Sequence, residues 1–370
     1  MRELRDILDA LAEAQAQGER AALGTVIRVR GSTYRREGAR LLIRADGGTV
    51  GSVSGGCLEG DIAEIARGVL ESGRARLAQY DLTSDDDSVW GLGLGCNGAI
   101  DVLIEPVPGD LPARLRRAID ERRTLVLATL VAGPEGLTPG ARIYLAEDGA
   151  PEGSLGDAAL DAPAVAAART QLDARRSALV TLDASGGPAE VFVEVLVPPL
   201  PLLICGAGHD TLPVVRLAHE LGWWVMVADS RPAYATRERF PGADEVVLSD
   251  DADVPRKVRI DRHTFVVVMT HNFLHDRTLL RALLGTPARY IGLLGPRART
   301  DRLLADLERD GVRIDDGQRA RLFGPVGVDL GAESPEEIAL SILAEIFALH
   351  NGRRVASLRE RGGPIHMPPA

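Results

Sequence analysis

The sequence predicts an α/β protein, with an N-terminal α/β domain followed by a C-terminal Rossmann-like domain built on a doubly wound parallel sheet. Strand and helix patterns alternate along both halves of the 370-residue chain, an order typical of α/β proteins. Residues 202–229 read in turn as a buried strand, a glycine turn, a helix and a second strand. That unit is the one from which Rossmann-like sheets are built.

The composition is that of an ordinary globular protein, with 45% hydrophobic and 26% charged residues. The net charge of −10 argues against non-specific binding to nucleic acid or to an anionic membrane. The first 16 residues have the pattern of an amphipathic helix rather than of a signal peptide, and no run approaches transmembrane length. We therefore expect a cytoplasmic protein that binds neither nucleic acid nor membranes.

The chain is expected to divide at a proline-rich segment. Residues 1–197 form the predicted N-terminal domain, and Pro-Pro-Leu-Pro at 198–201 is a stiff linker. Residues 202–352 form the Rossmann-like domain, and the Gly- and Pro-rich residues 353–370 are a flexible tail. We find no internal repeat and no long low-complexity stretch.

Hydrophobic periodicity sets the elements of each domain. Residues 146–160, rich in Gly, Asp, Glu and Pro, are expected to form a loop. A capping box opens the last helix at Ser334. In the N-terminal domain we expect helices at 1–16, 62–70, 111–120 and 164–172, and strands at 21–29, 41–43, 99–105, 124–130, 142–145, 178–182 and 191–197. In the C-terminal domain we expect strands at 202–204, 223–228, 245–248, 264–270 and 290–294.

Two glycine-rich loops of the N-terminal domain each carry a cysteine. The first runs through Gly55, Gly56 and Cys57 into a predicted helix. A cysteine just inside a helix N-terminus has a depressed thiol pKa, and such a loop is suited to holding an anion. The alternative is a small buried side chain in a turn needed for packing. The second loop, residues 90–98, contains Gly95 and Cys96, and its four glycines indicate close approach by a ligand or another segment.

The glycine turn of the C-terminal domain has the features of a dinucleotide site. Gly206 permits the tight turn and Gly208 lets a phosphate approach the backbone, beside the N-terminus of the following helix. Asp229, at the end of the second strand, is placed to accept from a ribose hydroxyl. Thr211 stands where a third glycine or alanine is usual. The alternative is a fold that has kept its turn and lost its ligand.

Two later strands of this domain end in polar residues. His271 follows the strand at 264–270, and Arg297 and Arg299 follow a glycine after the strand at 290–294. The carboxyl ends of parallel strands face the ligand site of such a sheet, and arginines there suit an anion. A capping or supporting role for His271 is equally open. Cys205 lies inside a predicted buried strand and is expected to be a small core residue.

Several of these stretches together resemble the XdhC/CoxI family of maturation factors for molybdenum hydroxylases, such as xanthine dehydrogenase and carbon monoxide dehydrogenase. The resemblance covers most of the chain and is weakest over residues 110–190. It is carried in the first domain by residues 31–40, 51–59 (Gly-Ser-Val-Ser-Gly-Gly-Cys-Leu-Glu) and 91–98, and in the second by 206–209 (Gly-Ala-Gly-His), 229–232, 239–243, 269–272, 290–295 and 335–345.

The resemblance implies a chaperone-like factor rather than a turnover enzyme. Such a factor binds the molybdenum cofactor (molybdopterin), protects it while a cysteine desulfurase supplies its sulfido ligand, and delivers it to an apo molybdenum hydroxylase. A homodimer is expected on the same ground. We assign no catalytic residue. Cys57 and Cys96 are hypothesised to converge on the metal end, and the candidate cofactor-binding residues are Gly55, Gly56, Cys57, Glu59, Gly95, Cys96, Gly206, Gly208, His209, Asp229, Arg231, His271 and Arg297.

Two other functions stay open from the sequence. An NAD(P)-dependent oxidoreductase would use the unit from Gly206 to Asp229, but no placed acid–base pair is found beyond His271 and Asp276. A non-catalytic scaffold for handling copper or selenium would use the cysteines, although two isolated thiols make a poor metal site without further ligands.

Overall fold

The computed structural model describes residues 1–31, 33–81 and 98–360. The chain divides into two compact units, Glu3–Pro198 and Pro199–Ala370. The predicted fold class is confirmed, because helices and strands alternate and the second unit is built on a parallel sheet. Among the described residues, no helix is both long enough and apolar enough to span a membrane.

The first sheet of the first unit is antiparallel, and its described strands have the order β3-β2-β1-β5-β4. Helix α2 covers one face by burying Ile62, Ala66 and Val69 against the strands. The elements are α1 (Arg2–Ala16), β1 (Ala21–Gly31), β2 (Arg40–Arg44), β3 (Thr49–Gly51), α2 (Glu59–Ser72), β4 (Arg76–Asp81) and β5 (Gly98–Pro106).

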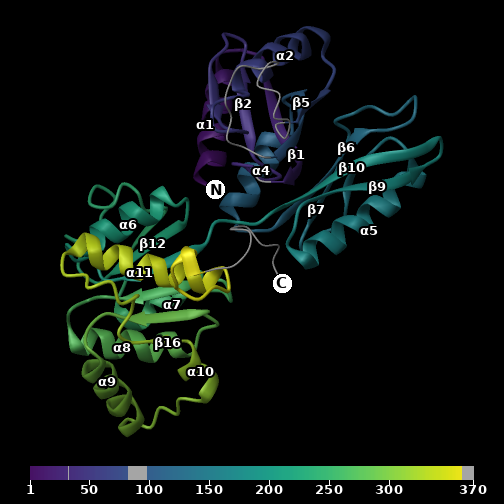
Figure 1. Cartoon of the computed structure of the whole chain (residues 1–370). Coiled ribbons are helices and arrows are strands. Elements are labelled where there is room, and N and C mark those ends of the chain that lie inside the picture. Colours follow the sequence, from purple (N-terminus) through teal and green to yellow (C-terminus); the bar gives the residue numbers. More distant parts are fainter. Residues whose placement is uncertain (32, 82–97, 361–370) are drawn as a thin grey trace. The chain divides into compact units, whose positions relative to one another are not determined.

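The second sheet of this unit is also antiparallel, with the described order β8-β7-β6-β10-β9. Helix α5 packs on it through Leu160, Ala164 and Ala168 (Figure 1). The elements are α4 (Leu111–Asp120), β6 (Leu125–Ala132), β7 (Arg142–Ala146), β8 (Glu152–Ser154), α5 (Ala158–Ala174), β9 (Ala178–Ala184) and β10 (Gly187–Leu196).

The two sheets are copies of one arrangement, so the prediction of no internal repeat was wrong. In each, the described elements run helix, three strands, helix and two strands, and the strands take corresponding places in the sheet. Gly51 pairs with the residue after Arg40, and Gly153 with the residue after Arg142. We call residues 2–106 repeat 1 and residues 111–196 repeat 2.

The repeats contact each other through equivalent residues. Arg40 at the start of β2 pairs with Glu194 of β10, and Arg142 at the start of β7 pairs with Glu105 of β5. All four charged side chains are buried. A small apolar cluster between the sheets is again made of counterparts, with Ile27 and Leu103 from repeat 1 and Val131 and Phe192 from repeat 2. The contact is therefore reciprocal, like that of a twofold dimer.

The second unit is a doubly wound parallel sheet. Its described strands have the order β13-β12-β11-β14-β15-β16, and helices cover both faces. The strands are β11 (Pro201–Cys205), β12 (Trp224–Asp229), β13 (Glu245–Leu248), β14 (Phe265–Val268), β15 (Tyr290–Leu293) and β16 (Leu322–Phe323). The helices are α6 (Thr211–Glu220), α7 (Val254–Lys257), α8 (Phe273–Leu284), α9 (Arg297–Arg309), α10 (Asp316–Ala320) and α11 (Pro335–His350).

Most predicted elements are present, and one predicted loop is wrong. Residues 146–160 contain strand β8 and the first residues of α5. The sequence placed the helix after Pro163, yet α5 begins at Ala158 with Asp157 capping the Ala159 amide. Burial of Leu160, a full turn before the proline, stabilises this earlier start.

Candidate functional site

The glycine–cysteine loop between β3 and α2 is organised by the carboxylate of Glu59. Its Oε1 accepts from the Ser52 hydroxyl at 2.9 Å and from the Val53 and Ser54 amides at 3.3 and 3.0 Å. Its Oε2 accepts from the Ser54 hydroxyl at 2.5 Å and the Leu58 amide at 3.1 Å. These donors use the acceptor capacity of a carboxylate, which has about four lone-pair positions.

Glu59 therefore acts on the loop itself. Burial works to raise its pKa, but the hydrogen bonds from Ser54 and Ser52 outweigh burial and lower the pKa to about 2. The side chain is ionised at neutral pH and accepts from the amides and hydroxyls of its own loop. We expected Glu59 to contact the cofactor, whereas its contacts are those of a residue that fixes the backbone beside Cys57.

Cys57 was predicted to lie just inside the N-terminus of the helix, but it lies just before it. Helix α2 begins at Glu59 with Leu58 as its N-cap, so the cysteine precedes the helix instead of standing in its first turn. It is a free, half-buried thiol. Gly55 and Gly56 beside it are exposed. In the part of the chain that the structure describes, the amides of Gly55 and Cys57 have no hydrogen-bond partner.

A hollow of about 400 Å³ lies next to this loop within the first unit. Tyr34 connects the two features, because it lines the hollow and its ring faces Gly55. Glu3 also lines the hollow, accepts from the Ser52 amide at 2.7 Å and pairs with Arg35. The volume falls in the range of small-molecule sites, about 300 to 1,000 Å³.

Gly95 and Cys96 lie outside the described residues, so the predicted convergence of Cys57 and Cys96 stays a prediction. Over residues 1–31, 33–81 and 98–360, no group of three or more His, Cys, Asp or Glu side chains is arranged to hold a metal ion.

In the second unit, the glycine turn packs against the neighbouring strand. Gly206 has φ +119, and a Cβ there would lie 2.6 Å from the carbonyl oxygen of Met269, so only glycine fits. The hydroxyl of Thr211 is buried and donates to the Gly206 carbonyl at 2.8 Å. That bond accounts for threonine where a small residue is usual, because the side chain closes the turn.

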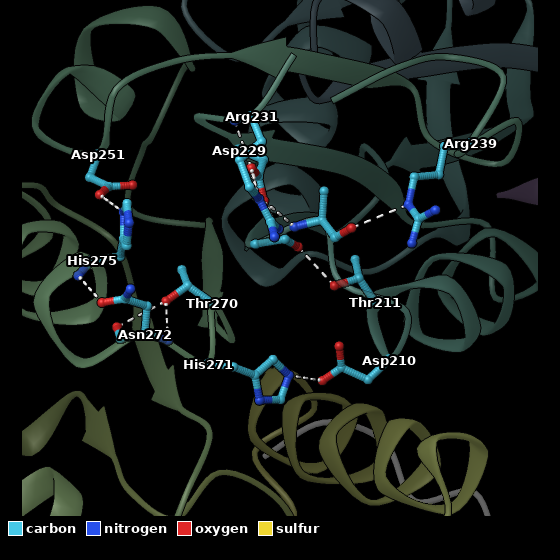
Figure 2. A network of polar contacts seen from close by, with 12 residues as sticks. Asp210, Thr211, Asp229, Arg231, Arg239, Asp251, Thr270, His271, Asn272 and His275 are labelled. Atoms are coloured by element: carbon cyan, nitrogen blue, oxygen red, sulfur yellow. Dashed lines mark hydrogen bonds and ion pairs between the residues drawn. The ribbon is translucent and has the colours of Figure 1, made fainter. Parts of the chain in front are cut away.

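The carboxylate of Asp229 is fully engaged by the protein (Figure 2). Oδ1 accepts from the amide and Nε of Arg231 at 2.8 and 2.9 Å. Oδ2 accepts from Arg231 Nη2 and from the Ala207 amide, both at 2.7 Å. Burial works to raise the pKa of Asp229, but these bonds lower it overall. With its acceptor positions filled, Asp229 has none left in this structure for the ribose hydroxyl that the sequence predicted.

His271 lies at the point where the strand order of the sheet reverses, between β11 and β14. Its Nε2 is 2.7 Å from Oδ2 of Asp210, the N-cap residue of α6 (Figure 2). The imidazole is 61% exposed, and the backbone has φ +59, which is uncommon outside glycine. Asp210 was not singled out from the sequence, since only the fold brings it to the histidine.

The remaining candidates have simpler surroundings. His209 is exposed between Gly208 and Asp210. Arg297 is the exposed first residue of α9, whereas Arg299 pairs with the buried carboxylate of Asp276. Cys205 is fully buried in β11, and burial raises the pKa of its thiol, as expected for a core cysteine. The ring of Tyr234 contacts the guanidinium groups of both Arg231 and Arg239, and neither Tyr234 nor Arg239 was singled out from the sequence as a candidate site residue.

Comparison with known proteins finds a matching family model for each of the two units. The model of the XdhC Rossmann domain matches residues 202–346. The model of the XdhC and CoxI family matches residues 14–81 and 118–183. These two stretches cover corresponding parts of the repeats, from the end of the first helix to the strand after the second.

Individual relatives align over nearly the whole chain. A protein of Bacillus subtilis (strain 168), named as a probable subunit of xanthine dehydrogenase, is 33% identical, over 95% of this chain and 98% of the relative. The molybdenum cofactor insertion chaperone PaoD of Escherichia coli (strain K12) is 25% identical, over 93% of this chain and 88% of the relative. A crystal structure described as a xanthine dehydrogenase from Bacillus halodurans is 33% identical with a TM-score of 0.74, over 95% and 97%.

Proposed function

This chain belongs to the XdhC and CoxI family, and from that premise we propose that it is a maturation factor for a molybdenum hydroxylase. It would bind the molybdenum cofactor as cargo, hold it while a cysteine desulfurase supplies the sulfido ligand, and pass it to the apo hydroxylase. The name of the relative PaoD, a cofactor insertion chaperone that aligns over most of the chain, supports this role. A homodimer remains part of the proposal.

The observation that carries the proposal is the ordered loop around Cys57. The Glu59 carboxylate fixes the loop, while the thiol and the neighbouring Gly55 amide lie at the surface without a described hydrogen-bond partner. The cargo is a pterin dithiolene with a phosphate, so it offers a soft metal–sulfur end to a thiolate. Cys57 would contact that end, and the hollow beside Tyr34 offers room for a small molecule.

The alternative of an NAD(P)-dependent oxidoreductase receives less support. A diol-binding acidic residue is the part of the dinucleotide fingerprint that reads the ribose. Here the carboxylate of Asp229 is filled by Arg231 and by the Ala207 amide. Binding a ribose in the usual way would require displacing Arg231.

The repeats supply a matched control for testing the proposal. Ala159, in the first turn of α5, precedes Leu160 of repeat 2 as Cys57 precedes Leu58 of repeat 1, and both leucines are buried. The experiment loads the purified chain with molybdenum cofactor and measures activation of an apo molybdenum hydroxylase. We expect Cys57→Ser to lose most of the activation and Ala159→Ser to retain it. Equal activation by both variants would remove Cys57 from the proposal.

A further inference from the structure

We propose that Arg231 and Arg239 form a site for the phosphate of a phosphorylated small molecule, at the carboxyl edge of β11 and β12. The inference concerns the second unit alone and goes beyond the cargo role of the first. It assigns the ligand class from the side chains that surround the glycine turn. A ligand with a phosphate monoester at this position is accepted, whereas one that offers only a ribose diol is not.

The carboxylate of Asp229 is not open to a ribose diol in this structure. In a diol-binding site this carboxylate must be open to hydroxyl donors. Here Arg231 holds both oxygens with its Nε and Nη2, and the Ala207 amide adds a further bond. The same ion pair fixes the guanidinium of Arg231, whose side chain is 48% exposed. The Nη1 of Arg231 makes no bond to Asp229. The position that would read a diol therefore presents a cation.

Arg239 supplies the second guanidinium group of the proposed site. Its Nε donates to the carbonyl of Ala207 at 3.2 Å, so its guanidinium lies against the glycine turn. Figure 2 shows the two terminal nitrogens directed away from that bond. Within the described residues they have no hydrogen-bond or ion-pair partner. They are donors in the planar fork geometry that suits phosphate oxygens.

Both arginines contact the ring of Tyr234. The guanidinium carbon of Arg231 is 4.0 Å from the centroid of the Tyr234 ring, and that of Arg239 is 5.1 Å from the same centroid. Both guanidinium groups therefore contact one ring, which orients each of them. Among Asp229, Arg231, Tyr234 and Arg239, two guanidinium groups accompany one carboxylate.

These features favour a phosphate monoester as the ligand. Two guanidinium groups offer N–H donors that Asp229 and Ala207 do not use, and their positive charge is complementary to a dianion. The amides of Gly208 and His209, which have no partner among the described residues, lie beside Ala207 and add neutral donors of the same kind. A neutral diol would gain none of the charge complementarity and would lack its usual acceptor.

The experiment compares two ligands that differ by one phosphate monoester. Calorimetry at fixed ionic strength gives the affinity of the full chain for 2′-AMP and for adenosine, which offers only the ribose diol. We expect 2′-AMP to bind about tenfold tighter or more, since charge-assisted bonds to phosphate are worth about 1.4 kcal/mol or more. Arg239→Gln should abolish the difference. Arg216→Gln, at an exposed arginine of α6, should preserve it.

A measurement on the unaltered chain guards against misfolding of the variant. Phenylglyoxal modifies accessible arginines, and mass spectrometry reads each position. We expect 2′-AMP to protect Arg231 and Arg239, and adenosine at the same concentration to leave them reactive. Equal affinities for the two ligands, or no protection, would overturn the inference. Neither result bears on Cys57, whose test reads transfer of the cargo.

Discussion

Arg40 and Glu194 form a buried, bidentate ion pair, with Nη1–Oε1 and Nη2–Oε2 distances of 2.8 and 2.5 Å. The pair joins the two repeats, and Arg142 with Glu105 repeats it in the opposite direction. In the described residues, the Nε of each arginine is buried without a hydrogen-bond partner, and both line one small cavity between the sheets. The N-terminal unit is therefore a covalently linked pseudo-dimer.

Removing one partner of such an ion pair should lower the free energy of unfolding more than replacing both partners with apolar residues. Arg40→Met leaves the carboxylate of Glu194 buried and unpaired, and should lower the free energy of unfolding by about 3 to 5 kcal/mol. The double variant Arg40→Met with Glu194→Leu should recover most of that loss, since a well-packed apolar pair avoids the desolvation penalty. Urea denaturation of the three proteins tests this. A double variant no more stable than Arg40→Met would contradict it.

Gly51 and Gly153 should respond alike to substitution by alanine. Their φ values are +88 and +95, and an added Cβ would lie 2.5 and 2.3 Å from the carbonyl oxygens of Arg40 and Arg142. Each alanine should destabilise the protein by about 1 to 3 kcal/mol through backbone strain, and the clash adds to this. Gly47→Ala serves as control, because it has a similar φ of +90 but no atom within 4 Å. It should cost less than either.

The Glu59 loop should make stability depend on acid pH. The folded-state pKa is lowered to about 2, below the value of about 4.3 in an unfolded chain. Its contribution is therefore fully present above pH ~4.3 and is lost as the pH falls toward 2. Glu59→Gln should be less stable than the parent at pH 6, by about 1 to 3 kcal/mol, and the gap should narrow at pH 3. Thermal unfolding at both pH values gives the comparison, and a gap independent of pH would refute the assignment.

The cysteines should differ in reactivity. Cys205 is fully buried, and burial raises the pKa of its thiol, so it should resist iodoacetamide until the protein unfolds. Cys57 is half-buried at the surface loop and should be alkylated in the native state. Peptide mapping by mass spectrometry distinguishes the two positions. Native alkylation of Cys205 at the rate of Cys57 would show that β11 is not in the core.

His271 should carry backbone strain. Its φ of +59 is adopted readily by glycine, and a side chain there costs about 1 kcal/mol or more. His271→Gly should therefore be more stable to urea than His271→Ala by about 1 kcal/mol, although both lose the contact with Asp210. If alanine were equal or better, the left-handed conformation would not be the one present in solution.

The elements set by local pattern could be predicted from the sequence. The run from 202 to 229 has an apolar strand, glycines and a helical stripe in the order that a parallel sheet requires, and the Ser334 capping box is present as expected. Helix α9 was missed because Arg297–Arg309 is dominated by charged residues. Its buried stripe consists only of Thr300, Leu303 and Leu307.

What depends on pairing across the fold could not be predicted. The repeat leaves a short sequence trace, Gly-Ala-Arg at 38–40 and again at 140–142, which becomes significant only once the strand registers are known. The engagement of Asp229 depends on the direction of the Arg231 side chain two residues later. The sequence shows that Asp229 and Arg231 follow the same strand, but it does not show that their side chains bond to each other.

The cofactor content of the purified protein tests most directly whether this chain carries the molybdenum cofactor. The chain is purified from a host that makes the cofactor, oxidised, and assayed for fluorescent pterin and for molybdenum. We predict near-stoichiometric pterin in the parent protein and a large loss in Cys57→Ser but not in Ala159→Ser. Absence of pterin and molybdenum from the parent, with NAD(H) bound instead, would contradict the claim.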